Sequence, residues 1–412
     1  MKILILTQYF PPEVGAPQNR LFELAVRLKE QGNEVTILTA MPNYPKMVVH
    51  EGYRRKWYKR EEIAGLTVHR SWIFVSQRKS IFFRLLNYFS FVFSSFWVGL
   101  FRIRRQDVLL VESPPLFLGK TAFLLSRLKR AKMIFNVSDL WPESAEKLGL
   151  VKNRFFLWIS YKLEAFLYRR SWIITGQTQG IVKDIQHRFP VKKVFWLPNG
   201  VNVRLFKNDS EGAKKWRSEQ GYTDNDVLFL YAGIIGYAQG LDVILNAAKR
   251  TKENPNIKYI LLGSGPEKER LLELAASLHL QNVKFLEPVE KKQMPAIVSA
   301  IDAAVIPLRK LDLFLGAIPS KLFENLALEK PLVLGVDGEA RELFIEKGRG
   351  GLYFEPENDE ELANAIQRLA HDPELRKQLG KQGAEYVKEY FDLDKIAAKF
   401  SSILIENSAK NG

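Results

Sequence analysis

The segment PSKLFEN at residues 319–325 carries three side chains whose types and spacing suit a bound nucleotide. Ser320, Lys321 and Glu324 lie within one turn of a helix of each other, so they can contact one ligand. A carboxylate can accept two hydrogen bonds from a vicinal ribose diol, and a serine, a lysine and a helix N-terminus offer donors and positive charge to a diphosphate. The alternative is structural, with Ser320 capping the helix and the carboxylate favoured by the helix dipole. The residues of the neighbouring loops distinguish between these two interpretations.

Glycine-containing loops follow several predicted strands in the same half of the chain. YAGIIGYAQGLD contains Gly236 and Gln239, and GSGPE begins with Gly263, so the backbone there can approach an anion closely. FLEPV ends a further strand and contains Glu287. Arg309 follows the next strand and could reach the same edge, although a solvated arginine is the simpler interpretation of that residue alone. With these loops in place, the segment is interpreted as part of a nucleoside diphosphate site.

Strands and helices must bring these loops together. In the first 200 residues, strand-like runs such as KILILT, TVHRSWIFV and DVLLVES alternate with helical patterns such as NRLFELAVRLKEQG, and the alternation restarts at VLFLYAG. Val-, Ile- and Leu-rich runs joined by helices predict parallel, doubly wound α/β sheets, in which ligands bind beyond the carboxyl ends of the strands. We therefore expect two Rossmann-like domains with a cleft between them.

The expected domain boundary lies at LPNGVNVRLFKNDSEG, residues 197–212, which contains turn-forming residues and few apolar ones. Residues 1–196 then form the N-terminal domain and residues 213–387 the C-terminal domain. A single helix over about 379–407 is predicted to follow the second sheet.

Composition limits the class of protein. The 412 residues suit two domains, and the absence of cysteine excludes disulfides and thiolate metal sites and fits a reducing cytoplasm. The five histidines are isolated and cysteine is absent, so no metal is expected. In residues 1–200, 32 Lys and Arg face 14 Asp and Glu, a balance of +18, whereas the remainder has a balance of −3. A basic N-terminal half predicts an anionic partner, such as nucleic acid, an acidic membrane surface or a phosphorylated substrate.

One segment of the basic half, RLLNYFSFVFSSFWVGLFRIRR at 84–105, has no charge over residues 85–101. Its polar residues share roughly one helix face, and aromatic and aliphatic residues occupy the other. A helix lying on the membrane interface is favoured, with a buried domain helix and a true span as alternatives. The basic clusters RRKWYKR and RLKRAK favour membrane contact, although a solvated charged face explains each cluster alone. The expected membrane residues are Arg84, Phe89, Phe93, Trp97, Arg102, Arg104 and Arg105.

Taken together, the motifs resemble those of a known family. YFPPEVGAPQNR, LTAMPNYP, SPPLF, DLWPES, LPNGV, GIIGYAQGL, GSGPE and PSKLFENLALEKP occur in the expected order over nearly the whole chain. The chain resembles the retaining, metal-independent glycosyltransferases of the GT-B fold, glycosyltransferase family 4 (group 1). Within that family it is similar to the L-fucosamine transferase-like (WbuB-like) enzymes of bacterial surface polysaccharide assembly.

The resemblance implies a UDP-sugar donor, with Glu324 on the ribose and the diphosphate near Lys321, and no cofactor. It also implies that the N-terminal domain binds the acceptor and faces the membrane, and that the C-terminal helix, about 388–412, packs back on it. Loop residues Gly15, Ala16 and Arg20 are expected on the acceptor side. The residues expected to bind the donor are Glu324, Lys321, Ser320, Ala317, Gly316, Arg309, Gly236, Gln239, Gly263 and Glu287.

Two departures from the family pattern concern the donor. Many relatives have a second glutamate eight positions before the one on the ribose, where this chain has Gly316. The arginine and lysine common in the 233–240 loop are here Ile234 and Gln239, so phosphate charge must depend more on Lys321 and Arg309. Donor specificity is expected to depend on the replacement at Gly316.

A third departure concerns the acceptor side, where many relatives have a histidine–aspartate pair and this chain has NVSDLWPES. This stretch offers Asp139 and Glu143 as candidate catalytic residues. Lys321, on the donor side, is the third candidate. Asp139 is expected to contact the donor sugar or the acceptor, with a helix-capping or structural role as the alternative.

These observations favour a retaining glycosyltransferase that moves a sugar, such as an N-acetylated deoxyamino sugar, from a UDP-sugar to a lipid-linked (undecaprenyl diphosphate) saccharide. It would act in O-antigen, capsule or exopolysaccharide synthesis, at the cytoplasmic face of the plasma membrane, with no nucleic-acid partner. The alternatives are a UDP-sugar 2-epimerase of the same fold, and a non-catalytic membrane-binding, nucleic-acid-binding or lectin-like protein.

Overall fold

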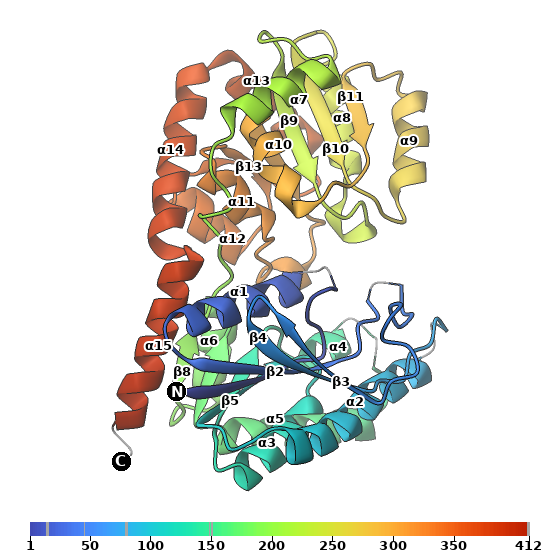
Figure 1. Ribbon diagram of the computed structural model, residues 1–412. Coiled ribbons are helices and arrows are strands. Elements are labelled where there is room, and N and C mark those ends of the chain that lie inside the picture. Colours follow the sequence, from blue (N-terminus) through green and yellow to red (C-terminus); the bar gives the residue numbers. More distant parts are fainter. Residues whose placement is uncertain (14–15, 45, 79–80, 148, 150, 410–412) are drawn as a thin grey trace. The chain divides into compact units, whose positions relative to one another are not determined.

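The computed structural model describes residues 1–13, 16–44, 46–78, 81–147, 149 and 151–409. The chain forms two compact units, each with its own sheet (Figure 1). One unit contains residues 1–199 and 396–412, and the other contains residues 200–395.

The N-terminal unit contains an eight-stranded sheet in the order β3-β4-β2-β1-β5-β6-β7-β8. All neighbours are parallel except β3, which pairs antiparallel with β4. Apolar residues fill the central strands and are buried, as expected for a sheet covered on both faces. The strands are β1 (Lys2–Leu6), β2 (Glu34–Ala40), β3 (Tyr58–Ile63), β4 (Leu66–Ser71), β5 (Val108–Ser113), β6 (Lys132–Val137), β7 (Ile173–Gly176) and β8 (Val194–Trp196).

Three helices, α2, α3 and α5, lie side by side beneath this sheet in the view of Figure 1, and α1 lies on its other face. The helices α2 and α3 are joined by a hydrogen bond from the Thr121 hydroxyl to the Val92 carbonyl, and α3 and α5 by contact of the Phe123 and Phe166 rings. The helices of this unit are α1 (Ala16–Glu30), α2 (Ile81–Arg102), α3 (Leu118–Leu128), α4 (Glu143–Lys147), α5 (Arg154–Arg170) and α6 (Gln179–Arg188).

The second unit contains a six-stranded parallel sheet in the order β11-β10-β9-β12-β13-β14. Its strands are β9 (Val227–Ala232), β10 (Ile257–Leu262), β11 (Val283–Leu286), β12 (Ala303–Pro307), β13 (Leu332–Gly335) and β14 (Gly351–Tyr353). Its helices are α7 (Ser210–Gln220), α8 (Asp242–Arg250), α9 (Lys268–Ser277), α10 (Met294–Ala300), α11 (Lys321–Ala327), α12 (Glu339–Arg341), α13 (Asp359–His371) and α14 (Pro373–Tyr390). The predicted fold class, two doubly wound parallel sheets, is therefore confirmed.

Two local predictions were wrong. The expected single helix over 379–407 is two helices, because α14 ends at Tyr390 and α15 (Leu393–Ala409) begins after a break. At the break Phe391 is fully buried, and its carbonyl accepts a hydrogen bond from the Val201 N–H at 2.9 Å. The run TVHRSWIFV was expected to be one strand, but β4 ends at Ser71 and the following residues bond to helix α2 instead.

Candidate functional site

Helix α11 carries the predicted nucleotide-binding segment directly before β13. Leu322, Phe323 and Leu326 are fully buried and fix the helix against the domain. Phe323 packs against Phe344 and Phe391, with ring centroids 5.3 and 5.1 Å away. Because the apolar side chains occupy the inner face, the side chains at 321 and 324 lie on another face and remain partly exposed.

Lys321 lies in an apolar setting with no carboxylate bonded to it. Its ammonium is 3.8 Å from the centroid of the Tyr231 ring and next to Gly233, where an added Cβ would come within 2.9 Å of Nζ. In the part of the chain that the structure describes, no acidic group lies within ion-pair distance of Nζ. Burial lowers the pKa of Lys321 to about 7, although the nearby Glu324 carboxylate opposes this shift. A ligand anion would supply the missing counter-charge.

Glu324 likewise has few polar contacts within the described part of the protein. Its carboxylate lies 3.9 Å from Lys291 Nζ and is 24% exposed, and no described residue donates a hydrogen bond to it. Burial raises the pKa of Glu324, against the opposing effects of Lys291 and Lys321. A carboxylate without donors is costly in a protein interior unless a ligand supplies them. Ser320 makes no capping hydrogen bond to α11, so the structural alternative for this serine is wrong.

The loops after β9 and β10 are pressed together beside Lys321, and only glycine fits at their contacts. A Cβ on Gly263 would lie 1.8 Å from the Gly233 carbonyl oxygen, and one on Gly265 would lie 2.2 Å from that of Ile235. Both glycines also have positive φ, 153° and 159°. These loops therefore present backbone rather than side chains, as expected where a phosphate approaches closely.

Other predicted donor residues are already bonded within the domain. Arg309 donates to Glu357 at 2.8 Å and to the Tyr237 carbonyl at 2.8 Å, and its guanidinium is 3.6 Å from Asp242. It lines a cavity of about 520 Å³ between the β9 and β12 loops and α8. Glu287 is exposed and pairs with Lys268.

The remaining donor-side predictions fall on loops. Gly236 is buried and caps a 3-10 turn, Tyr237–Gln239, with the Gln239 side chain against it. Gly316 is exposed, and an added Cβ there would meet no atom within 4 Å. The Ala317 N–H donates to the Phe314 carbonyl at 2.9 Å. Since Gly316 has open space around it, a longer side chain would fit there without rearrangement.

Two neighbours of the site, Tyr231 and Lys291, were missed from the sequence. Tyr231 is the last residue but one of strand β9, and its apolar surroundings suggested only a core residue. Lys291 begins a 3-10 turn, Lys291–Gln293, after β11 and stood in the sequence as one of two adjacent lysines. Both residues come close to Lys321 or Glu324 only in the folded domain, so no local sequence spacing could have indicated them.

On the N-terminal unit, the predicted acceptor residues have mixed surroundings. Asp139 is exposed and accepts a hydrogen bond from the Ser144 hydroxyl at 2.8 Å, and Glu143 pairs with Lys147 at 2.6 Å. Ala16 is the first residue of α1, and Gly15 lies outside the described residues.

Arg20 forms a buried ion pair that the sequence did not reveal. Its NH2 group donates to both Glu112 carboxylate oxygens, at 2.7 and 2.9 Å, and to the Ser138 hydroxyl at 2.8 Å. Asn136 also donates to Glu112. Because Ser138 directly precedes Asp139, this network fixes the start of the loop that presents Asp139.

An exposed apolar row runs along α2. Phe93 and Trp97 are 57% and 41% exposed, and Phe89 lies one turn before Phe93 on the same side. Exposed apolar side chains continue on α3 and α5, which the sequence did not single out: Leu124, Leu128, Phe155, Trp158, Ile159 and Phe166. We call the exposed apolar side chains of α2, α3 and α5 the aromatic face. Arg84, Arg102, Arg104 and Arg105 are exposed at the ends of the α2 segment.

The polar side chains of α2 lie inside the domain. Asn87 and Ser94 are buried, and Asn87 donates to the Phe74 carbonyl at 2.6 Å. Ser90 accepts from the Phe74 N–H at 2.8 Å, and Ser94 donates to the Trp72 carbonyl. The apolar row is thus the outward one. Among the described residues, no helix combines the length and apolar character needed to cross a bilayer.

Comparisons with known proteins cover nearly the whole chain. A family model described as glycosyl transferases group 1 matches residues 213–386, and one described as glycosyl transferase 4-like domain matches residues 15–200. The putative colanic acid biosynthesis glycosyl transferase WcaI of Escherichia coli K12 is 27% identical over 408 residues, which cover 97% of this chain and 98% of the relative.

Solved structures share the fold. Sucrose-phosphate synthase from Thermosynechococcus elongatus superposes with a TM-score of 0.73 at 16% identity, covering 100% of both chains. HepE (Alr3699) of Anabaena, solved in complex with UDP and glucose, superposes with a TM-score of 0.71 at 17% identity, covering 98% of this chain and 99% of that chain.

Proposed function

Because this chain belongs to the group 1 glycosyltransferases of family 4, a retaining family with the GT-B fold, we propose that its donor is a UDP-sugar and its acceptor a lipid-linked saccharide. The observation that carries this proposal is the pair formed by Lys321 and Glu324 beside glycine loops at one sheet edge. Among the described residues, the Lys321 ammonium has no carboxylate within ion-pair distance, and the Glu324 carboxylate has only a 3.9 Å ion pair with Lys291 and no hydrogen-bond donor. The UDP complex of HepE, on the same fold, supports the choice of nucleotide.

In the proposed site, Glu324 accepts hydrogen bonds from the ribose hydroxyls and Lys321 neutralises the diphosphate. Ser320, which is exposed and caps nothing, is free to donate to the same phosphates. Charge that develops on the leaving diphosphate is met by Lys321 and backbone N–H groups, so we propose a reaction without a metal. The leaving diphosphate takes the acceptor proton in a front-face displacement. Asp139 contacts the donor sugar or the acceptor.

We further propose that the product belongs to a bacterial surface polysaccharide. The similarity to WcaI, a putative colanic acid biosynthesis glycosyl transferase, supports this role. The motif set supports the L-fucosamine transferase-like subgroup and an N-acetylated deoxyamino sugar as the transferred group. The open space at Gly316 is the structural reason to expect a donor sugar different from that of relatives with a glutamate there.

A thermal-shift series tests the nucleotide. UDP and a UDP-sugar are expected to raise the melting temperature, because a ligand that binds only the native state stabilises it by RT ln(1 + [L]/Kd), about 2.7 kcal/mol at a hundredfold excess over Kd. GDP and dTDP at equal concentration serve as base and sugar controls and are expected to shift it less. A response to no nucleotide would reject the proposed function, and a larger response to GDP would reject the uridine assignment.

The aromatic face is proposed to bind an anionic membrane surface. Replacing Phe93 and Trp97 by serine should weaken binding to phosphatidylglycerol-containing vesicles by about tenfold or more, because each buried aromatic contributes about 1.5–3 kcal/mol. Raising the salt concentration should also weaken vesicle binding, but UDP binding should stay nearly unchanged. Vesicle flotation would measure both effects.

The matched control for this experiment is Tyr390→Ser with Ile405→Ser, since these side chains are 58% and 61% exposed and belong to α14 and α15 rather than to α2, α3 or α5. Equal losses in the two double variants would show that the aromatic face is not the binding surface. Equal weakening of vesicle and UDP binding by salt would contradict the separation of the two sites.

A further inference from the structure

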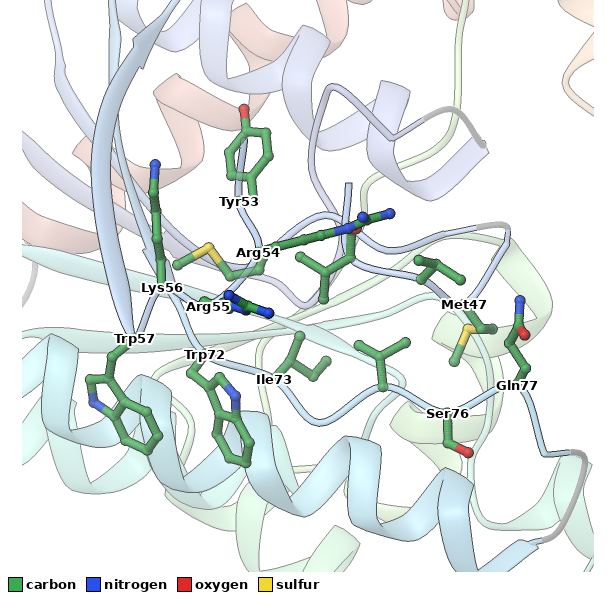
Figure 2. A pocket seen from close by; sticks show the side chains of 14 residues that line it. Met47, Tyr53, Arg54, Arg55, Lys56, Trp57, Trp72, Ile73, Ser76 and Gln77 are labelled. Atoms are coloured by element: carbon green, nitrogen blue, oxygen red, sulfur yellow. The ribbon is translucent and has the colours of Figure 1, made fainter. Parts of the chain in front are cut away.

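The N-terminal unit contains a cavity of about 630 Å³ that the proposed nucleotide site does not use (Figure 2). Two segments form it, residues 47–57 and residues 72–77, together with Met41. The pairing of β3 with β4 brings these segments together, and the Trp72 N–H donates to the Trp57 carbonyl at 2.9 Å.

Three adjacent cations line this cavity. Arg54, Arg55 and Lys56 are exposed, and none of them pairs with a carboxylate in the described part of the chain. Arg54 Nε donates to the Val49 carbonyl at 3.2 Å, and Lys56 Nζ donates to the Gly52 carbonyl at 2.8 Å. Figure 2 shows the Arg54 side chain extending across the middle of the cavity with Arg55 close to it. No acidic residue is among the described residues that line the cavity, so its chemistry suits a ligand with several negative charges.

The backbone at two lining positions is unusual. Arg55 has φ 59° and Met47 has φ 52°, both in the left-handed region that residues other than glycine adopt rarely. Such conformations are retained where the surrounding structure requires them, and they are common at binding sites. The left-handed backbone at Arg55 sets the direction of that guanidinium side chain in the cavity lining.

Most of the remaining lining residues are apolar or aromatic, and Ser76 and Gln77 are polar. Trp57 and Trp72 stack with centroids 5.0 Å apart and an interplanar angle of 15°, and Trp57 is 54% exposed. Figure 2 shows both indoles side by side at one end of the cavity, pointing toward the light blue ribbon of α2. Ile73 and Val75 lie along the same wall. A ligand that fills the cavity therefore needs an apolar part next to its charged part.

The wall of the cavity is bonded to the helix that carries the aromatic face. The Trp72 carbonyl accepts from the Ser94 hydroxyl, and Phe74, between lining residues Ile73 and Val75, is bonded through its N–H and carbonyl to Ser90 and Asn87. The opposite side of the same helix exposes Phe93 and Trp97. A ligand in the cavity is thus separated from the aromatic face by one helix.

We propose that this cavity binds the diphosphate and the first isoprene units of a lipid-linked acceptor, an inference that rests on the proposed function. The three unpaired cations bind the two phosphates, and the tryptophan stack and aliphatic wall contact the isoprenoid chain as it leaves toward the membrane. A phospholipid headgroup with one phosphate would leave most of this charge unmatched. Inorganic diphosphate would leave the apolar wall uncovered.

Farnesyl diphosphate is a suitable probe, with the full-length chain and isothermal titration calorimetry. Arg54→Ser with Arg55→Ser is expected to raise its Kd by about tenfold or more, since both lost contacts are charge-assisted. Trp57→Ala is expected to weaken farnesyl diphosphate but leave inorganic diphosphate unchanged. Lys152→Ser with Lys183→Ser removes the same charge from two exposed positions elsewhere in this unit and is expected to have no effect.

The outcomes separate this inference from the proposed function. If the wild type binds UDP and the Arg54–Arg55 variant binds farnesyl diphosphate as the wild type does, the cavity assignment is overturned and the nucleotide site stands. If farnesyl diphosphate binding depends on Arg54 and Arg55 but no nucleotide binds, the cavity stands and the proposed function fails. If the variant loses binding to phosphatidylglycerol vesicles but retains farnesyl diphosphate, the cavity is a phospholipid site and the inference is wrong.

Discussion

Replacing Glu324 by glutamine is expected to raise the Kd for UDP by at least about tenfold. The substitution keeps the size of the side chain but removes the negative charge, and a hydrogen bond to a charged group contributes about 1.5–3 kcal/mol. Since no described residue donates to this carboxylate, its loss should disturb little in the free protein. Glu324→Ala should abolish measurable sugar transfer. Calorimetry with UDP and release of UDP from UDP-sugars would measure the two effects.

A ligand series identifies which part of UDP the carboxylate contacts. In the wild type, 2′,3′-dideoxyuridine diphosphate should bind more weakly than UDP, whereas in Glu324→Gln the difference between the two should be much smaller, because a neutral amide oxygen accepts weaker hydrogen bonds than a carboxylate. Glu329→Gln is the control, because Glu329 is exposed five residues along the chain, with only a 3.9 Å ion pair to Lys388. If the variant still distinguishes the two nucleotides as strongly as the wild type, Glu324 does not bind the ribose.

Lys321→Met is expected to have the second large effect, a loss of about a hundredfold or more in turnover, typical of removing one group that stabilises charge in a transition state. The wild type should also show a characteristic pH dependence. The pKa of Lys321 is about 7 in the free protein, and a bound diphosphate raises it. Below pH 7 the side chain is already charged. Above pH 7 binding must take up a proton, so the Kd for UDP should rise as the pH increases.

This linkage can be measured directly between pH 7.5 and 9, where the phosphates of UDP are fully ionised because their last pKa is near 6. Calorimetry in buffers of different ionisation enthalpy should show proton uptake by the wild type and none by Lys321→Met. Uridine, which has no phosphate, should bind without proton uptake in both proteins. A pH-independent Kd for UDP in the wild type would place Lys321 away from the diphosphate.

Most of the fold could be predicted because the sequence patterns that mark its strands and helices are local. Val-, Ile- and Leu-rich runs mark buried parallel strands, and both sheets follow them. Strand β3, with sequence YKREEI, was missed because an edge strand exposed to solvent has no apolar pattern. The break after α14 was missed because no glycine or proline marks it, and it depends on the burial of Phe391 by residues far away in the sequence.

The candidate site likewise contains residues that local spacing could place and residues that only the packed domain brings together. Lys321 and Glu324 could be placed together because helical spacing alone brings them near each other. The partner of Arg309, Glu357, is 48 residues away, so its ion pair depends on the packed domain. The cavity beside Trp57 needs the antiparallel pairing of β3 with β4, and the cluster RRKWYKR was interpreted only as a basic surface.

The inward hydrogen bonds of α2 also affect how the enzyme would meet its acceptor. Asn87, Ser90 and Ser94 hold the helix to residues 72–74, and each bond contributes about 1 kcal/mol, so α2 cannot sink into the bilayer without partial unfolding. If the aromatic face binds a membrane as proposed, the depth of its lipid contact would be set by the fold and not by the lipids. Such a protein would stay at one height above the bilayer, and acceptors would reach it by lateral diffusion. The search for acceptor then becomes two-dimensional, and its rate depends on acceptor density per membrane area.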